Sequence, residues 1–361
     1  MSGHSFLDVR FNDVMHVALA RAASDIHLIP GARPAIRVDG GLEYVDGPVV
    51  TAEETDLLAE RYLDERALAR LRETGDTTAT AKELDRHLLR VHVLQTEPGL
   101  AVAVRILPRT VPPLETLHLP SVVARFARKQ RGLVIFAGPT GSGKSTSLAA
   151  LVGRINSEQS RRIITIEDPI EYRHESLRSI VAQREVGRDV PSYASAVIGS
   201  LRADPDVIMI GEMRDTPTMR AALTAAETGH LVLTTLHTGD AVQTIDRIVD
   251  AFEGDEQTQV RTQVATALVA VVAQRLLPQL RSKGRRLAAE ILIATDAVRA
   301  TIREGRIHQL RNVMLTARDT GMQTLEHHLS ELLAEGQIDR TSAAAATDRD
   351  GELREVAGVA I

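Results

Sequence analysis

Residues 138–145 read Gly-Pro-Thr-Gly-Ser-Gly-Lys-Ser, which fits the spacing of a phosphate-binding loop. Its glycines let backbone N–H groups turn inward around phosphate oxygens, which bulkier side chains would obstruct. Lys144 supplies a positive charge for the β- and γ-phosphates, and the Ser145 hydroxyl is a ligand for Mg²⁺. The residues expected to bind the nucleotide here are Gly138, Pro139, Thr140, Gly141, Ser142, Gly143, Lys144, Ser145 and Thr146. This stretch predicts a nucleotide-binding protein.

The flanking sequence predicts the elements that position this loop. Residues 133–137 are an apolar run typical of a buried strand. After the loop, apolar residues recur at helical spacing at Leu148, Leu151, Val152 and Ile155. The N-terminus of that helix would face the phosphates. A glycine-rich loop without a ligand is the alternative, and the strand–loop–helix order favours the phosphate loop.

Three more short apolar strands are expected at residues 163–166, 207–210 and 231–235. Helical or irregular segments separate them, which indicates crossover connections and a mostly parallel sheet. Each strand is followed directly by polar residues. The first polar side chain is Glu167 after the first strand, Glu212 after the second and His237 after the third. Because ligands bind at the carboxyl edge of such a sheet, we expect these side chains near the phosphate loop.

The chemistry of these side chains has more than one interpretation. Glu212 is placed as a Walker-B-type carboxylate, which orients the attacking water or holds Mg²⁺ through water; a helix-capping or solvated acid is the alternative. Glu167 and Asp168 either activate water or form a solvated turn. His237 either senses the γ-phosphate, relays between subunits, or is structural.

Composition excludes several classes of site. The 361 residues are enough for two or three domains. A net charge of −5 and 2% aromatic residues argue against a nucleic-acid partner. The absence of cysteine excludes disulfides, thiolate metal sites and cysteine nucleophiles. The longest apolar run, residues 264–273, is too short to span a bilayer, so we expect a cytoplasmic protein that meets a membrane only through a partner.

The chain divides into three expected parts. Residues 1–110 form an α+β domain with an opening helix, a hairpin turning at Asp39, a helix over residues 53–72 and strands at 87–95 and 100–107. Prolines at 108, 112 and 113 mark a linker. Residues 111–340 form the nucleotide-binding domain, helical from about residue 256. Residues 341–361 are expected to be a flexible tail.

Longer motifs identify a family. Residues 24–27 and 36–40 resemble its N-terminal domain, and residues 166–172, 204–215 and 224–238 resemble its Asp box, Walker B and His box. In this order the motifs resemble the secretion and pilus motor ATPases, most closely the PilT-type pilus retraction ATPases. The resemblance covers residues 23–338, nearly all of the chain expected to be ordered.

The resemblance implies an α/β fold in which a PAS-like N-terminal domain precedes a RecA-like P-loop ATPase domain with a helical C-terminal part. It implies ATP and Mg²⁺ as cofactors, a ring of six copies, and an inner-membrane pilus platform protein as partner. It also implies Glu167 as the base, Glu212 as the Walker B acid, and His230 and His237 as active-site histidines. Arg90 and Arg105 match arginines that the family's first domain supplies to the nucleotide; a solvated strand face is the alternative.

Two features bear on whether the ATPase drives pilus retraction or drives assembly and export. Assembly and export members usually carry a tetracysteine zinc module, and this chain has no cysteine. Residues 297–304 agree at five of eight positions with the Ala-Ile-Arg-Asn-Leu-Ile-Arg-Glu segment of retraction ATPases. We therefore expect an ATPase that powers pilus retraction. The alternatives are a member driving assembly or secretion, a RecA-like nucleic-acid motor, and a subunit that does not hydrolyse ATP. A GTPase is disfavoured because an Asn-Lys-x-Asp segment is absent.

Overall fold

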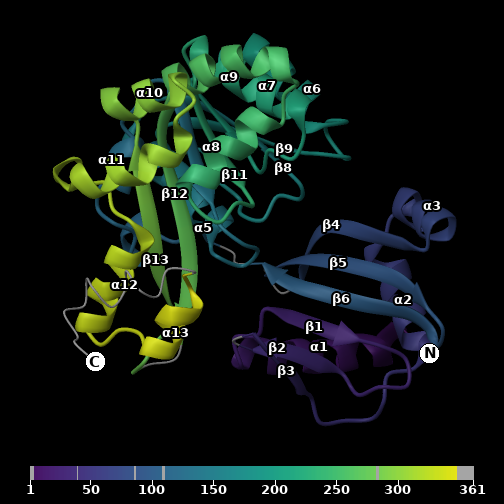
Figure 1. Ribbon diagram of the computed structural model, residues 1–361. Coiled ribbons are helices and arrows are strands. Elements are labelled where there is room, and N and C mark those ends of the chain that lie inside the picture. The colour runs from purple at the N-terminus through teal and green to yellow at the C-terminus, as the bar shows by residue number, and fades with distance from the viewer. Residues whose placement is uncertain (1–3, 39, 85–86, 108–109, 282–283, 348–361) are drawn as a thin grey trace. The chain divides into compact units, whose positions relative to one another are not determined.

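The computed structural model describes residues 4–38, 40–84, 87–107, 110–281 and 284–347 (Figure 1). The chain divides into two compact units, Met1–Thr110 and Val111–Ile361, called unit 1 and unit 2 below. Each unit has a β-sheet with helices packed on it, which confirms the expected α/β class.

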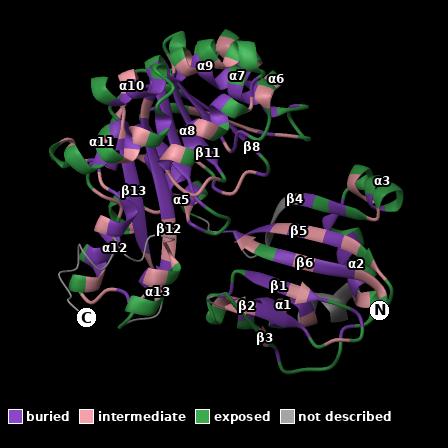
Figure 2. Cartoon of the chain, viewed as in Figure 1, coloured by how far each residue is buried: buried purple, intermediate pink, exposed green. Residues whose placement is uncertain are grey.

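The described part of unit 1 has a six-stranded antiparallel sheet in the order β3-β2-β1-β6-β5-β4. Its elements are α1 (His4–Ala20), β1 (Asp25–Leu28), β2 (Ala35–Val38), β3 (Gly41–Tyr44), α2 (Ala52–Tyr62), α3 (Glu65–Thr74), β4 (Asp76–Leu84), β5 (His87–Thr96) and β6 (Gly99–Leu107). Ile26, Val91 and Val104 lie side by side on three strands and are buried with residues of α1 and α2 (Figure 2). Because side chains alternate along a strand, the residues between them lie on the other face.

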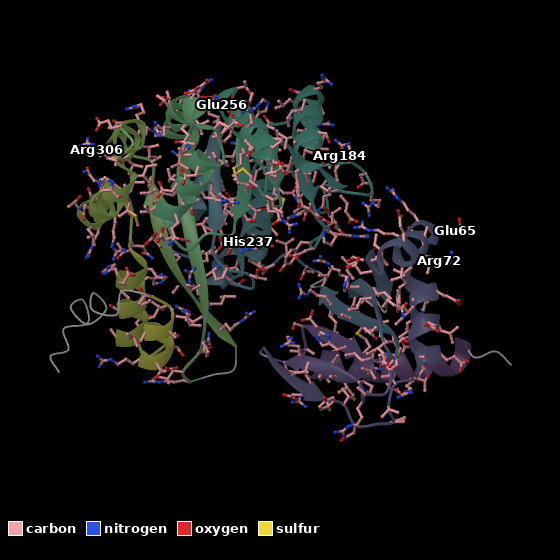
Figure 3. The ribbon with its side chains drawn as sticks, turned by 45° about the vertical axis from the view of Figure 1, so that its right-hand side comes forward. Glu65, Arg72, Arg184, His237, Glu256 and Arg306 are labelled. Carbon is pink, nitrogen blue, oxygen red and sulfur yellow. The ribbon has the colours of Figure 1, made fainter. Side chains whose placement is uncertain are left out.

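Two expectations for unit 1 were wrong. The helix expected over residues 53–72 is two helices, because Leu63 is extended and the Asp64 side chain accepts a hydrogen bond from the Ala67 N–H to begin α3. Glu65 and Arg72 on α3 are exposed (Figure 3). Strand β4 was not expected, and it completes the sheet by pairing with β5. The hairpin joins β2 to β3, but its turn residue Asp39 lies outside the described residues.

The described part of unit 2 has a seven-stranded sheet in the order β13-β12-β7-β11-β10-β8-β9. Its strands are β7 (Gly132–Ala137), β8 (Arg162–Glu167), β9 (Ile180–Glu185), β10 (Val207–Ile210), β11 (Leu231–Leu236), β12 (Leu268–Pro278) and β13 (Arg285–Ile293). Neighbouring strands are parallel except β12 and β13, which form an antiparallel pair.

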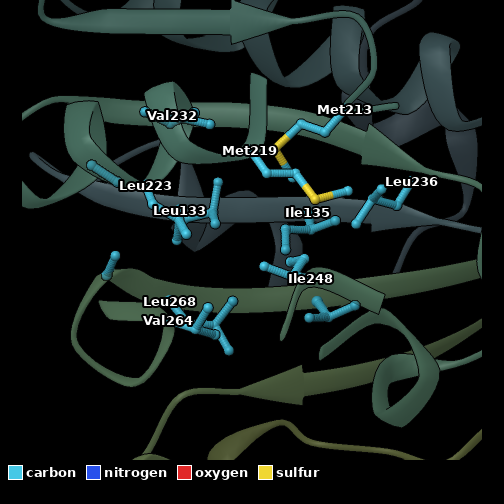
Figure 4. Close-up of a cluster of buried hydrophobic side chains, with 14 of the residues drawn as sticks. Leu133, Ile135, Met213, Met219, Leu223, Val232, Leu236, Ile248, Val264 and Leu268 are labelled. Carbon is cyan, nitrogen blue, oxygen red and sulfur yellow. The ribbon is translucent and has the colours of Figure 1, made fainter. Parts of the chain in front are cut away.

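The helices of unit 2 cover both faces of this sheet (Figure 1). They are η1 (Leu114–Leu117), α4 (Val123–Phe126), α5 (Lys144–Glu158), α6 (Tyr193–Ser200), η2 (Leu201–Ala203), α7 (Thr216–Glu227), α8 (Ala241–Asp250), α9 (Gly254–Ala267), α10 (Asp296–Arg303), η3 (Ile307–Gln309), α11 (Leu310–Thr316), η4 (Arg318–Thr320), α12 (Leu325–Ala334) and α13 (Arg340–Ala345). In β7, Leu133 and Ile135 face the core with α7 to α10 (Figure 4), whereas Val134 and Phe136 face the core with α4 and α5. Burial on both faces explains why these strands read as continuous apolar runs.

The structure differs from the expectations for the end of the chain in two places. Beyond residue 256 the chain is not all helical, because β12 and β13 form a hairpin that adds to the sheet beside β7. The apolar run 264–273 spans the end of α9 and much of β12, and a short apolar run does not distinguish helix from strand. The segment expected to be a tail begins with α13, whose Ala343 is buried. Residues 348–361 lie outside the described residues.

No helix within the described residues is both long and apolar enough to cross a membrane.

Ile135 tests how much the sheet depends on its interior. It is fully buried in β7, so Ile135→Ala should leave a cavity and lower the free energy of unfolding by about 2–5 kcal/mol. Ile198 on α6 is 51% exposed, and Ile198→Ala should change stability by less than about 0.5 kcal/mol. Urea unfolding followed by circular dichroism measures both, and equal losses would contradict this placement.

Candidate active site

The phosphate loop connects the carboxyl end of β7 to the N-terminus of α5. Gly143 caps the helix in a left-handed conformation, with φ at 88°. A Cβ on Gly138 would lie 2.5 Å from the backbone carbonyl oxygen of Gln274 and from the Ser142 hydroxyl. Only glycine therefore fits at residue 138. The helix N-terminus and its free N–H groups face the loop, as an anion site requires.

Polar groups inside the loop fit a phosphate ligand. The Lys144 side chain is buried, and its ammonium donates to the carbonyl oxygens of Gly138 at 2.8 Å and Pro139 at 2.9 Å. Burial lowers the pKa of Lys144, and the charge of Glu212 opposes that shift. The buried Ser142 hydroxyl has no hydrogen-bond partner among the described residues. An anion would satisfy both groups. The Thr146 hydroxyl lies 3.0 Å from the Tyr172 hydroxyl, and its expected role in binding stays a prediction.

The register of the sheet brings the polar strand ends to one edge. Ile210 of β10 lies between Ile166 of β8 and Thr234 of β11, and β11 ends beside the last residue of β7. Glu167, Glu212 and His237 therefore lie at the edge that carries the phosphate loop. His237, at the end of β11 (Figure 3), places its Nε2 atom 3.5 Å from Oε2 of Glu212. The structure brings these side chains together as expected.

Glu212 is the mostly buried acid beside the loop. Its Oε1 atom accepts a hydrogen bond from Arg214 at 2.5 Å, and its charge is near enough to Lys144 to oppose the lowering of that lysine's pKa by burial. A carboxylate held among cations at the end of a strand can bind a metal ion directly or through water.

Glu167 is the second buried acid. Its Oε1 atom accepts hydrogen bonds from the Thr165 hydroxyl at 2.6 Å and from the Gln183 amide at 3.1 Å. Burial raises the pKa of Glu167 to about 7, and these hydrogen bonds limit the rise. A carboxylate with a pKa near the working pH is suited to accept a proton from water.

His230 lies away from this group of side chains. It comes directly before β11, so it is at the amino edge of the sheet, whereas the phosphate loop is at the carboxyl edge. Its Nδ1 atom is 2.9 Å from the carbonyl oxygen of Ala225. Within one chain His230 therefore lies away from the phosphate loop, and its expected role as an active-site histidine that binds nucleotide stays a prediction.

Arg90 and Arg105 are neighbours in unit 1. They face each other across β5 and β6, on the sheet face opposite Val91 and Val104. The Arg105 side chain is 51% exposed, and its Nε atom donates to Oδ1 of Asp25 at 2.8 Å. The two arginines thus share the polar face of this sheet. Their expected contact with nucleotide stays a prediction.

The sequence analysis missed residues that β12 brings to the site. Ala273 pairs with Ala137, so Gln274 and Arg275 continue beside the phosphate loop. The buried Gln274 amide donates to the Ser147 hydroxyl at 2.9 Å, and Arg275 donates to the carbonyl oxygen of Gly239 at 2.9 Å. The signal was present, because the apolar run ends in polar residues as the other three strands do. It was missed because this run was assigned to a helix.

Comparison with known proteins agrees with this geometry. Residues 2–343 match the family described as "Type II/IV secretion system protein". The chain belongs to this family. It is 42% identical to a twitching motility protein of Neisseria gonorrhoeae, over 84% of this chain and 82% of that protein. It is 40% identical to the type IV pilus retraction ATPase PilT of Pseudomonas aeruginosa, over 92% of this chain and 96% of that protein.

A solved structure extends the likeness to the whole fold. The crystal structure of the pilus retraction motor PilT with bound ADP matches with a TM-score of 0.87 and 41% identity. The match covers 95% of this chain and 98% of that one. The chain therefore has the family's two-domain architecture.

Glu167 predicts a pH dependence. A group with pKa raised to about 7 is protonated below that pH and cannot accept a proton, so kcat/KM for ATP should rise with pH around a midpoint near 7. Burial also raises the pKa of Glu290 to about 7, which makes Glu290→Gln the matched control. The acid limb should persist in Glu290→Gln and disappear in the residual activity of Glu167→Gln. A profile of the unsubstituted protein that stays flat from about pH 5.5 to 8.5 would refute this role.

Proposed function

We propose that this chain is a Mg²⁺-dependent ATPase that powers type IV pilus retraction. The observation that supports it most is the meeting of Lys144, Glu212, Glu167 and His237 at one edge of the sheet. The proposed mechanical function, pilus retraction, is based on the relatives that are named for twitching motility and pilus retraction.

Each side chain has a defined task in this proposal. Phosphoryl transfer needs positioning and charge stabilisation more than covalent chemistry from the protein. Lys144 and the loop N–H groups bind the β- and γ-phosphates. Ser145 and Glu212 hold Mg²⁺, which supplies positive charge to the phosphate oxygens. Glu167 orients water and takes up its proton, and His237 lies where it can contact the terminal phosphate.

Mechanical work requires more than one chain. We propose a ring of six copies with ATP between neighbours, in which Arg90 and Arg105 add charge to the nucleotide. Arginine binds phosphate through two parallel hydrogen bonds, so release of product would weaken the contact and let the units move. The ring would act on an inner-membrane pilus platform protein and reach the membrane through it.

Lys144 tests both the chemistry and the task. Lys144→Ala removes the charge aimed at phosphate, so ATP turnover should fall below detection while the circular dichroism spectrum stays unchanged. In cells that lack the natural gene product, a Lys144→Ala copy should leave surface pili in excess, because retraction needs hydrolysis. Electron microscopy of shed or surface pili measures this.

The outcomes separate the alternatives. An unchanged ATPase rate in folded Lys144→Ala would end the active-site assignment. Cells without pili, in place of cells with too many, would assign the ATPase to assembly.

Arg105 tests the contribution of unit 1. Arg105→Ala should retain the ring, measured by light scattering, and lose most ATPase activity. Arg105→Lys should restore only part of it, because lysine lacks the paired donors of arginine. Asp25→Asn is the matched control, since it removes the negative charge that pairs with Arg105 within unit 1 and leaves the guanidinium in place. If Asp25→Asn loses as much activity as Arg105→Ala, the arginine has a structural role only.

A further inference from the structure

The segment from His237 to the start of α8 is short and closely held. Three residues, Thr238, Gly239 and Asp240, separate His237 from α8. Inside this segment, called the His237 loop below, the Thr238 hydroxyl lies 2.6 Å from the Thr244 hydroxyl. The Asp240 carboxylate accepts from the Gln243 N–H at 2.7 Å, which caps α8. Where this loop lies determines where His237 stands relative to Glu212.

Arg275 holds the loop from β12. Its guanidinium donates to the carbonyl oxygen of Gly239 at 2.9 Å and to that of Gln274 at 3.1 Å. The Gln274 carbonyl oxygen is one of the two atoms that leave no room for a Cβ on Gly138. One guanidinium therefore joins the His237 loop to the strand against which the phosphate loop packs. Its charge is also close enough to lower the pKa of Lys144.

Glu290 holds the other end of the loop from β13. It faces Ala273 across the hairpin and is buried, and its Oε1 atom accepts a hydrogen bond from the Ala241 N–H at 2.8 Å. Ala241 is the first residue of α8, and its N–H has no partner within the helix. A carboxylate at this position satisfies that donor and lies favourably at the helix N-terminus.

We propose that Arg275 and Glu290 are positioning residues that hold His237 in place for ATP hydrolysis. The β12–β13 hairpin, through these two side chains, sets the distance between His237 and Glu212 without touching substrate. This inference rests on the proposed ATPase function and adds to it two residues outside the family motifs.

The same hairpin connects the loop to the C-terminal helices. Oε2 of Glu290 lies 3.9 Å from Arg311 of α11, and Arg311 also pairs with Glu326 of α12 at 2.8 Å. Glu290 and Glu326 are both buried. Movement of α11 or α12 would therefore be transmitted to Ala241 through the buried carboxylate of Glu290 and its ion pair with Arg311.

The test is a double-mutant cycle on the full chain. Arg275→Gln should lower kcat for ATP about tenfold, because misplacing a reacting group by about 1 Å can cost about a hundredfold and loss of one of the contacts that hold the loop should shift His237 by less. KM and the dissociation constant for ADP should change less than about twofold. In a His237→Ala background, Arg275→Gln should cost less than about twofold further, because the group that it positions is already gone.

Glu290 offers a second comparison. Glu290→Gln keeps an oxygen that can accept from the Ala241 N–H and should retain most of kcat. Glu290→Leu leaves that N–H without an acceptor and should lower kcat with the same dependence on His237.

Arg299→Gln is the matched control. Its guanidinium also donates to backbone carbonyl oxygens, those of Ala265, Thr266 and Leu268, but these lie at the junction of α9 and β12 and outside the His237 loop. It should reduce stability and leave kcat unchanged.

Two results would overturn the inference. One is a kcat of Arg275→Gln equal to that of the unsubstituted protein. The other is a loss of the same size with and without His237, which would mean that Arg275 acts independently of it. Failure of the unsubstituted protein to hydrolyse ATP is a different result, and it would overturn the proposed function together with this inference.

Discussion

The close approach of β7 and β12 at Gly138 is the constraint on which the site depends. The Gln274 carbonyl oxygen and the Ser142 hydroxyl both occupy the space that a Cβ would need. This contact fixes where the phosphate loop begins, and the parallel register of β7, β11, β10 and β8 then determines which side chains surround it. A shift of one residue in any of these strands would turn its terminal acid or histidine to the opposite face.

Burial of charge is the cost of this arrangement. Glu167 and Glu290 have pKa values raised to about 7 from 4.5, because burial disfavours their ionised forms. The folded state therefore holds protons that the unfolded state releases between these two values, so ionising them reduces stability as pH rises through that window. The apolar strands, which are buried on both faces, stabilise the fold and offset the free-energy cost of burying these two acids. At Glu167 the same shift gives a base suited to neutral pH.

In the proposed mechanism, the two units supply different groups to the nucleotide. Unit 2 holds the phosphate loop, the acids and His237, whereas Arg90 and Arg105 lie on the polar face of the unit 1 sheet. The partner of Arg105 within unit 1 is Asp25. The Arg105 side chain is half exposed, although Asp25 is buried, so water partly screens this ion pair and reduces its contribution to stability. An arginine held so weakly is available to an anion of higher charge. In the proposed mechanism, Arg105 links unit 1 to the nucleotide, so that ATP hydrolysis can move unit 1 relative to unit 2.

Local sequence patterns correctly predicted the phosphate loop and the strands that lead to Glu167, Glu212 and His237. They also predicted that these side chains meet at one edge of the sheet. They could do so because a strand's direction follows from chain order, and parallel strands end at the same edge. The position of β12 beside β7 could be seen only in the folded structure, because strand order depends on packing between segments far apart in sequence. This position brings Arg275 and Glu290 to the His237 loop. The distance between His230 and the phosphate loop within one chain has a related cause. His230 lies near His237 in sequence, but a strand separates them, and the two ends of a strand lie at opposite edges of the sheet.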